Sequence, residues 1–513
     1  MTCHFNLIDE PWIPCQSVDG RSEFLGLSET FRRATEIRRI YDSSPLVTIA
    51  LHRLLLAILY RTQAPEKPAD WRSMQTGGWN QELIKQYLQD WHDWFDLFSE
   101  DHPFMQLQGF IAKEPTPISK LAEEMAAGNN ATLFDHSMDD KPVAVSPAVA
   151  AQRLVAAQCF ALGSGGGYKQ ASGVSGTLTL VMRDTLAATL AANCAPKSIL
   201  AHGPFSLGTS ASKDLPAWER SDASRFGGAR VPDGPADLYA WSSRKVRLLP
   251  LTAPDGTTTI KTIYYGPGGE LKWDFRDPMK NWILSPDRGW VSIPLKEDRC
   301  LWHESYSLFN TFEFGNTNAQ LCPAAALLAA RDSDGVSTLC IVFGMLTKTG
   351  GGGVALWRQE HFALPVRLLQ DEDVPAQIKQ AISMADDVAC IIRDNVLKFA
   401  TEYLKGEDGR NCDKKGAERM AKAVTRESDF WASLETPFHS FLSSLGGEKP
   451  HFRDWQSTLR RQAVSAFEAS VSGREQTARS LRAAVRARNK FDAQLNEILP
   501  KEDNNEPTNQ GAT

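Results

Sequence analysis

A glycine-rich stretch at residues 163–169 (GSGGGYK) has the residue types that a phosphate-binding loop uses. A P-loop, however, requires Gly-Lys followed by Ser or Thr after four spacer residues. Tyr168 stands where the second glycine should be, Gln170 replaces the magnesium-binding hydroxyl residue, and the dinucleotide fingerprint also fails at Tyr168. Nucleotide binding is therefore disfavoured. The stretch is either an idle surface loop or a loop whose bare backbone approaches a ligand closely, with Lys169 beside it for a phosphate.

A second glycine cluster follows a β-like apolar run at residues 337–346. Residues 347–353 (TKTGGGG) come next, and a β-like pattern resumes at residues 354–357. This order predicts a hairpin with a flexible tip, and four glycines exceed what a turn requires. The tip is therefore either idle or inserts its backbone into a narrow groove.

Basic side chains gather late in a chain whose formal net charge is −6. Residues 451–490 hold nine Lys or Arg against three Asp or Glu. Arg479, Arg482 and Arg486 recur at three-to-four spacing and should share one helix face. The adjoining face is expected to pack and consists of Ala478, Leu481 and Val485. The basic face is either solvated or contacts a nucleic-acid backbone or an acidic partner.

Sequence patterns typical of hydrolases and metal sites are missing. There is no HExxH motif, no Gly-x-Ser-x-Gly elbow, and no CxxC pair among the nine cysteines. We therefore expect a non-catalytic protein that needs no metal and no cofactor. The cysteines are scattered along the chain and their number is odd, which fits a reducing cytoplasm. Neither a signal peptide nor a membrane span is expected.

The spacing of apolar residues and breakers predicts the fold class. Gly and Pro punctuate short β-rich runs up to about residue 365, with a buried helix at residues 45–63 and an amphipathic helix at 81–98. Helical periodicity dominates afterwards. The expected class is α+β, with a large, irregular mixed domain over residues 1–365, an all-α four-helix bundle over 366–499 and a disordered tail over 500–513.

Six short motifs in order resemble the CasA family, the large subunit of the type I-E CRISPR Cascade complex. They are FNLIDEPWIP (residues 5–14), DHPFMQ (101–106), LFDH (133–136), the glycine loop at 163–169, LPAW (215–218) and WSSRKVRL (241–248). Each motif is short, but together they cover nearly the whole chain. The helical C-terminal part that the sequence predicts is also similar to this family.

The resemblance implies a non-catalytic subunit of an antiviral ribonucleoprotein complex. Its partners would be a guide RNA (crRNA), repeated backbone subunits, a small subunit and end-cap subunits. The subunit would recognise the protospacer-adjacent motif of double-stranded target DNA through the minor groove and help to open the duplex. A displaced DNA strand and a separately recruited helicase-nuclease complete the implied set of partners.

The resemblance also places particular residues near nucleic acid. The loop near the adjacent motif matches Gly165, Gly166, Gly167 and Lys169. The segment that docks near the 5′ end of the guide matches Leu133, Phe134 and Asp135. A lysine that approaches the motif matches Lys296, with Lys280 as the other candidate. The hairpin tip matches Lys348, Thr349, Gly350, Gly351 and Gly352, without the duplex-opening glutamine that some family members carry there.

Two other functions remain alternatives. The first is a nucleotide-binding enzyme that uses the loop at residues 163–169. The second is a purely structural scaffold subunit that holds partners without recognising DNA. The missing P-loop positions favour the DNA-recognition subunit over the enzyme.

Overall fold

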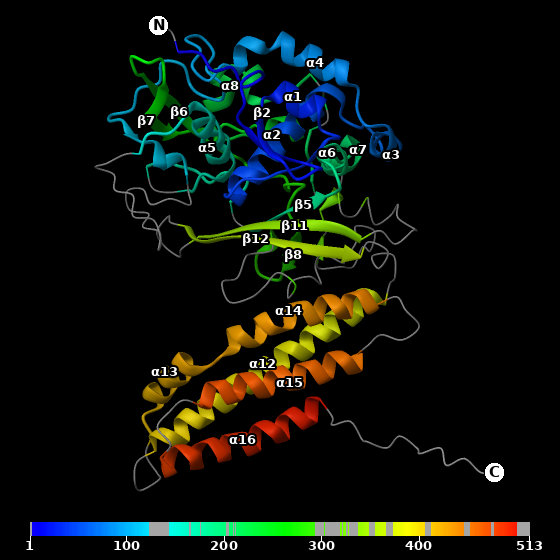
Figure 1. Cartoon of the computed structure of the whole chain (residues 1–513), viewed down its shortest axis with the longest axis vertical. Coiled ribbons are helices and arrows are strands. Elements are labelled where there is room, and N and C mark those ends of the chain that lie inside the picture. The colour runs from blue at the N-terminus through cyan, green and yellow to red at the C-terminus, as the bar shows by residue number, and fades with distance from the viewer. Residues whose placement is uncertain are drawn as a thin grey trace, which may run out of the picture. The chain divides into compact units, whose positions relative to one another are not determined.

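The computed structural model describes most of the chain in two units. The described residues are 3–122, 143–163, 166–174, 176–201, 205–208, 210, 212–292, 302, 319–320, 322–324, 327, 337–347, 354–365, 373–405, 412–445, 452–472 and 477–499. Residue contacts divide the chain into residues 1–297 with 310–367, and residues 298–309 with 368–513. The first unit mixes helices with small sheets and the second is helical, so the expected α+β class is confirmed (Figure 1).

The core of the first unit forms around helix α2 (Pro45–Gln63). The Ser44 hydroxyl accepts a hydrogen bond from the Val47 amide, and Pro45 occupies the first helical position. Every residue from Pro45 to Tyr60 is buried, which confirms the expected buried helix. The helix is long and apolar enough to cross a membrane, but 89% of its most apolar window is buried within the protein. Its composition is therefore that of a core helix.

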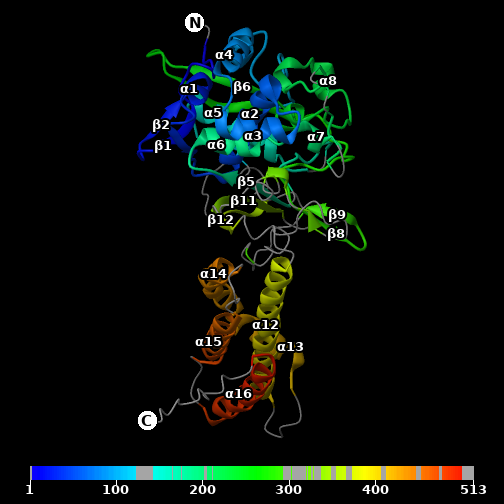
Figure 2. The ribbon, with the colours of Figure 1, turned by 90° about the vertical axis from the view of Figure 1, so that its right-hand side faces the viewer.

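A buried ion pair connects α2 to the rest of this unit. Helix α5 (Pro147–Phe160) packs against α2 (Figure 2). Helix α9 (Pro235–Tyr239) also contacts α2. On α2, Arg53 donates to the Asp277 carboxylate at 2.6 Å and to the Ser172 hydroxyl at 2.9 Å. Because an isolated buried charge is costly, this pairing makes Arg53 compatible with the core.

The helix expected over residues 81–98 is wrong in its C-terminal half. After α3 (Pro68–Gly77), helix α4 (Gln81–Asp90) ends early and a 3₁₀ turn, η1 (His92–Phe95), follows. The Leu7 amide donates to the Phe95 carbonyl, and the Leu97 amide donates to the Phe5 carbonyl, both at 2.9 Å. Pairing with the N-terminal segment holds this backbone extended, so tertiary contacts override the apolar periodicity.

Small antiparallel sheets surround the core. Strand β1 (Ile13–Ser17) lies between β2 (Ser22–Leu25) and β3 (Ile37–Ile40), and β7 (Thr258–Pro267) lies between β4 (Thr116–Pro117) and β6 (Arg244–Thr252). Strand β8 (Trp282–Ser285) lies between β9 (Gly289–Ser292) and β10 (Ala319–Gln320). The shorter helices of this unit are α1 (Leu27–Arg32), η2 (Ile118–Leu121), α6 (Leu186–Asn193), α7 (Lys197–Leu200), η3 (Ala217–Glu219) and α8 (Asp222–Phe226).

The two strands of the expected hairpin are present. Strands β11 (Ser337–Thr347) and β12 (Val354–Pro365) pair antiparallel, and β5 (Gly176–Met182) pairs with the other edge of β11 (Figure 1). The tip, residues 348–353, lies outside the described residues. Since β5 begins shortly after the glycine loop at residues 163–169, the same sheet is connected to both glycine-rich segments.

Long helices form the second unit. They are α12 (Val374–Leu404), α14 (Glu427–Ser444), α15 (Phe452–Val471) and α16 (Ala478–Ile498), with the shorter α13 (Lys414–Val424) beside α12. At one place the core is aromatic: Trp302 packs against Trp431, Phe438 and Trp455, with ring centroids 4.5–6.2 Å apart. Trp302 comes from well before α12 in the sequence, so the packing of this unit uses a residue that helical periodicity does not predict.

Candidate nucleic-acid interface

A backbone hydrogen bond joins the two ends of the glycine loop. The loop follows α5 and precedes β5, and the Ala171 amide donates to the Ala161 carbonyl at 2.9 Å. Within it, Gly166 has φ +75° and Gly167 has φ +87°. These left-handed conformations suit glycine and strain other residues. The described part of the loop therefore depends on glycine for its backbone course.

One buried arginine holds both ends of this loop. Arg244, at the start of β6, donates from Nη1 to the Lys169 carbonyl at 2.7 Å and from Nη2 to the Leu162 carbonyl. Its Nε donates to the Tyr265 hydroxyl at 2.9 Å, and the Tyr168 ring lies 5.3 Å from the guanidinium. The side chain is only 1% exposed. Its guanidinium therefore fixes the distance between the two arms of the loop.

The backbone of Arg244 is fixed in turn by Gln158 of α5. The Gln158 amide accepts from the Arg244 N–H at 2.9 Å and donates to the Arg244 carbonyl at 3.0 Å. The same Gln158 nitrogen lies 3.3 Å from the Met105 carbonyl, and Gln106 accepts from the Leu248 amide at 2.8 Å. The 101–106, 163–169 and 241–248 segments, which are far apart in sequence, therefore meet at one buried place.

Lys169 carries the exposed charge of the loop. Its ammonium lies 3.0 Å from the Glu270 carboxylate, and about half of each side chain is exposed. An exposed ion pair of this kind contributes only about 0–1 kcal/mol. Lys169 can therefore exchange Glu270 for a phosphate at little cost in stability.

The order of elements argues against a nucleotide-binding loop. In a P-loop a strand leads into the glycines and the next helix presents its N-terminus to the phosphates. Here helix α5 leads into the loop and strand β5 follows. The described structure therefore supplies no helix N-terminus at the exit of the loop to hold the phosphates of a nucleotide.

Several predicted site residues cannot be placed. Outside the described residues lie Gly165, Lys296, Leu133, Phe134, Asp135, Lys348, Thr349, Gly350, Gly351 and Gly352. The other candidate lysine, Lys280, is buried, and its ammonium donates to the Val174 carbonyl at 2.9 Å. Burial lowers its pKa to about 8. Lys280 therefore supports the chain between the glycine loop and β5 and does not face solvent.

The basic face expected on the last helix is present on α16. Arg479, Arg482 and Arg486 are all exposed. Arg486 forms an ion pair with Glu402 of α12 at 2.8 Å, and Arg482 donates to the Ala478 carbonyl at 3.1 Å. These contacts leave most of the guanidinium donors of the stripe facing solvent.

The expectation that Ala478, Leu481 and Val485 pack is wrong. Leu481 is 56% exposed, Val485 is 58% exposed and Ala478 is also exposed. The packed face of α16 lies two residues further along and consists of Ser480, Ala483, Ala487, Phe491 and Leu495. In the N-terminal half of α16 the packed face is made of the small residues Ser480, Ala483 and Ala487, and α16 packs against α12. Apolar bulk therefore does not mark that part of the packed face in the sequence.

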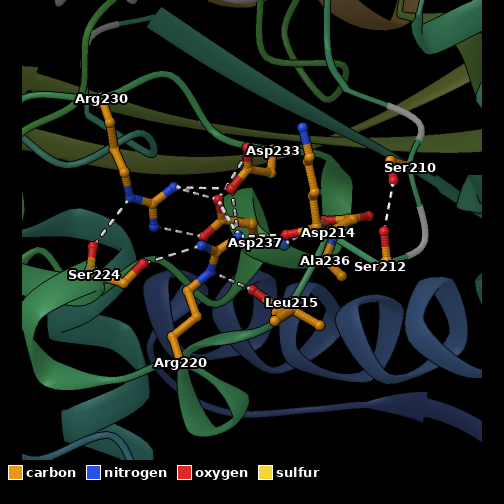
Figure 3. Close-up of polar contacts among 11 residues, drawn as sticks. Ser210, Ser212, Asp214, Leu215, Arg220, Ser224, Arg230, Asp233, Ala236 and Asp237 are labelled. Carbon is orange, nitrogen blue, oxygen red and sulfur yellow. Dashed lines mark hydrogen bonds and ion pairs between the residues drawn. The ribbon is translucent and has the colours of Figure 1, made fainter.

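A network of carboxylates and guanidinium groups holds the segment that precedes Arg244 (Figure 3). Asp237 lies 2.5 Å from Arg230 and 3.1 Å from Arg220, and Asp233 lies 2.8 Å from Arg220. Asp214 accepts from the backbone amides of Ala236 and Asp237. Sequence reasoning missed this network and the role of Arg244. The signal available was the WSSRKVRL motif, which marked Arg244 only as part of a family pattern.

We predict that Arg244→Gln loosens the glycine loop. Glutamine cannot reach both the Leu162 and Lys169 carbonyls, so the free energy of unfolding should fall by roughly 2–4 kcal/mol, as hydrogen bonds to a charged group are lost. Hydrogen exchange at the 166–169 amides should accelerate well beyond the global change. The control is Arg247→Gln, three residues along β6 and partly exposed. Equal exchange rates in the two variants would contradict the anchoring role.

We predict a pH effect from Asp214. Burial raises its pKa from 3.8 to about 6, so between these values the native state binds more proton than the unfolded state. Its contribution to stability is present below about pH 4 and is lost as pH rises through 6. The stability advantage of wild type over Asp214→Asn should therefore shrink by roughly 2–3 kcal/mol between pH 4 and 7, in urea unfolding. The same measurement on Asp90→Asn, at an exposed side chain that accepts from Gln86, is the control.

Comparison with known proteins identifies the family to which the chain is similar. The family model described as CRISPR-associated protein Cse1 matches residues 6–466. The CasA/Cse1 protein of Thermus thermophilus is 30% identical over 514 residues, covering 96% of this chain and 98% of the relative.

Solved structures have the same fold. Cse1 from Acidimicrobium ferrooxidans superposes with a TM-score of 0.79 at 22% identity, covering 97% of this chain and 99% of that one. A chain of a CRISPR RNA-guided surveillance complex gives 0.73 at 17% identity, covering 95% and 99%. Because the family model matches residues 6–466 of this chain, the chain belongs to the CRISPR-associated Cse1 (CasA) family.

Proposed function

We propose that this chain is the large, non-catalytic subunit of an RNA-guided DNA-surveillance complex and contacts the protospacer-adjacent motif through its glycine loop. The observation that carries the proposal is the loop itself: left-handed glycines, an adjacent lysine and a buried arginine that holds both arms. Membership of the Cse1 family supports it, as does the shared fold with a chain of an RNA-guided surveillance complex.

The loop suits a narrow groove on physical grounds. The minor groove of B-DNA is about 6 Å wide and admits backbone more readily than large side chains. A Cβ atom at Gly166 or Gly167 would meet nothing closer than 3.9 Å, so these glycines serve the backbone conformation and leave the outer surface of the loop unobstructed. Lys169 would then exchange Glu270 for a DNA phosphate, a contact that positions the protein without specifying sequence.

The remaining assignments extend this proposal. Base pairing with the guide RNA would carry target specificity, while the protein would recognise only the short flanking motif. Residues 133–135 would dock near the guide, and Lys296 and the tip at 348–352 would lie near the duplex. Because the tip has no glutamine, duplex opening would rely on backbone insertion. The other partners are the neighbouring complex subunits, the displaced strand and a recruited helicase-nuclease.

We predict that Gly166→Asp weakens binding of the assembled complex to motif-bearing duplex DNA at least tenfold more than Gly166→Ala does. Both variants carry the left-handed strain, about 1–2 kcal/mol, but only the aspartate repels phosphate. The assembled complex is the right object because the chain alone has a net charge of −6. Gly20→Asp, with φ +90° at another turn, is the control. Equal effects of Ala and Asp at position 166 would leave strain as the whole cause and favour the scaffold alternative.

We predict that the triple variant Arg479→Ala, Arg482→Ala, Arg486→Ala lowers the salt dependence of target binding. If the stripe guides a displaced strand, the slope of log affinity against log salt should flatten by about two units, at roughly 0.7 per single-strand phosphate contact. Preference for the flanking motif should survive. Poor co-purification with other subunits would instead assign the stripe to a protein contact. Normal assembly with an unchanged slope would leave it a solvated face.

A further inference from the structure

Trp273 is an exposed aromatic side chain close to the glycine loop. It is 47% exposed, and its two neighbours in the chain, Lys272 and Asp274, are exposed and form an ion pair with each other at 2.6 Å. A single exposed hydrophobic side chain is ordinary on a protein surface. Trp273 differs from that ordinary case in its place in the fold and in the way its ring is held.

Two contacts tie the segment around Trp273 to the glycine loop. Three residues before it, the Glu270 carboxylate lies 3.0 Å from the Lys169 ammonium. Seven residues after it, the Lys280 ammonium lies 5.9 Å from the centre of the Trp273 ring and donates to the Val174 carbonyl at 2.9 Å. The indole therefore lies near the chain that leaves the glycine loop.

The backbone before Trp273 is held by hydrogen bonds within the protein. The Arg230 amide donates to the Glu270 carbonyl at 3.1 Å, and the Lys272 amide donates to the Arg230 carbonyl at 2.9 Å. The Arg230 side chain is in turn held by Asp237, in the carboxylate network of Figure 3. The segment that carries the indole is therefore anchored without any partner molecule.

One face of the indole is already covered. The Trp273 and Phe275 rings are stacked, with centroids 5.6 Å apart and planes 10° from parallel, and Phe275 is buried. Because Trp273 is nevertheless about half exposed, its open surface must lie on the second face and the edges of the ring. Stacking on a buried ring limits the rotation of the indole, so a second flat ring can stack on it at little cost in side-chain entropy.

A nucleic-acid base fits this surface better than an apolar protein partner does. Charged residues are depleted from the centre of protein interfaces, whereas Trp273 stands between a lysine and an aspartate. Inside a duplex both faces of each base are covered by its neighbours, so an indole can stack only on a base that has lost a neighbour. Stacking on an aromatic side chain then offsets the lost stacking with little regard to sequence.

We propose that Trp273 stacks on a base that becomes unpaired where the target duplex opens beside the flanking motif. The inference rests on the proposed function of the glycine loop and extends it. Backbone insertion separates the two strands, and the indole then holds one of the released bases. That base belongs to the displaced strand or to the guide-paired strand, which offer the same ring chemistry.

The test measures the affinity of the assembled complex, with its guide RNA, for motif-bearing duplex DNA. Trp273→Ala should weaken binding by roughly five- to 150-fold, the range expected when one base–aromatic stack is lost. Trp273→Phe should weaken it less, because phenylalanine keeps a ring. Tyr41→Ala, at an aromatic side chain 57% exposed after β3, is the matched control and should bind as wild type does. If a thermal melt shows that Trp273→Ala is unfolded, Trp273→Leu replaces it, because leucine keeps apolar bulk without a ring.

Abasic nucleotides identify the base that is stacked. They are placed singly at each of the first few positions beside the motif, in one strand and then in the other. Where the stacked base is missing, Trp273→Ala should cause no further loss of affinity, because the two changes remove the same contact. Such a result in the displaced strand assigns the base to that strand, and the same result in the guide-paired strand assigns it there.

Three outcomes would overturn the proposal. They are wild-type binding by Trp273→Ala, an effect of Trp273→Ala that persists with every abasic duplex, and failure of the folded variant to assemble with the other subunits, which would assign Trp273 to a protein contact. Gly166→Asp in the same assay separates these outcomes from failure of the proposed function. If Gly166→Asp weakens binding and Trp273→Ala does not, only the stacking by Trp273 is excluded. If neither variant weakens binding, the glycine loop itself does not contact DNA.

Discussion

The organisation of the first unit depends on the burial of the Arg244 guanidinium. Among the described residues its hydrogen-bond partners are carbonyls and a tyrosine hydroxyl, without a carboxylate. A buried charge solvated by carbonyls requires those carbonyls to converge, and two of them belong to opposite arms of the glycine loop. The buried arginine therefore constrains the shape of the loop. Gln158 of α5 hydrogen-bonds the Arg244 backbone and so ties this constraint to α5.

The surroundings reinforce that constraint. Arg53 of α2 binds Asp277 and also Ser172, which lies shortly before β5, and Lys280 binds the Val174 carbonyl just before β5. The carboxylates around Arg220 and Arg230 hold the chain that enters β6 (Figure 3). A loop that must present bare backbone to a partner gains from such support, because preorganisation lowers the ordering cost of binding.

Local patterns in the sequence predicted much of the fold, and long-range contacts explain the failures. The buried helix at 45–63, the glycine-tipped hairpin and the helical C-terminal part all have strong local signals. The helix expected to reach residue 98 stops at Asp90 because Phe5 and Leu7 pair with the following backbone. Leu481 and Val485 are exposed because the small residues Ser480, Ala483 and Ala487 form the packed face of that half of α16. Arg244 was missed as a site residue because burial and partner geometry have no periodic signature.

We have proposed that the glycine loop lies against DNA beside the guide-paired target. A photo-crosslinking residue in place of Lys169, whose side chain is about half exposed, tests it most directly in the assembled complex with guide RNA and target duplex. We expect crosslinks to base pairs that flank the target, and we expect these crosslinks to be lost when the flanking motif is changed. The same residue in place of Val18, exposed elsewhere in the unit, should give none. Crosslinks from position 169 to a neighbouring subunit, with none to DNA, would contradict the placement of the glycine loop against DNA.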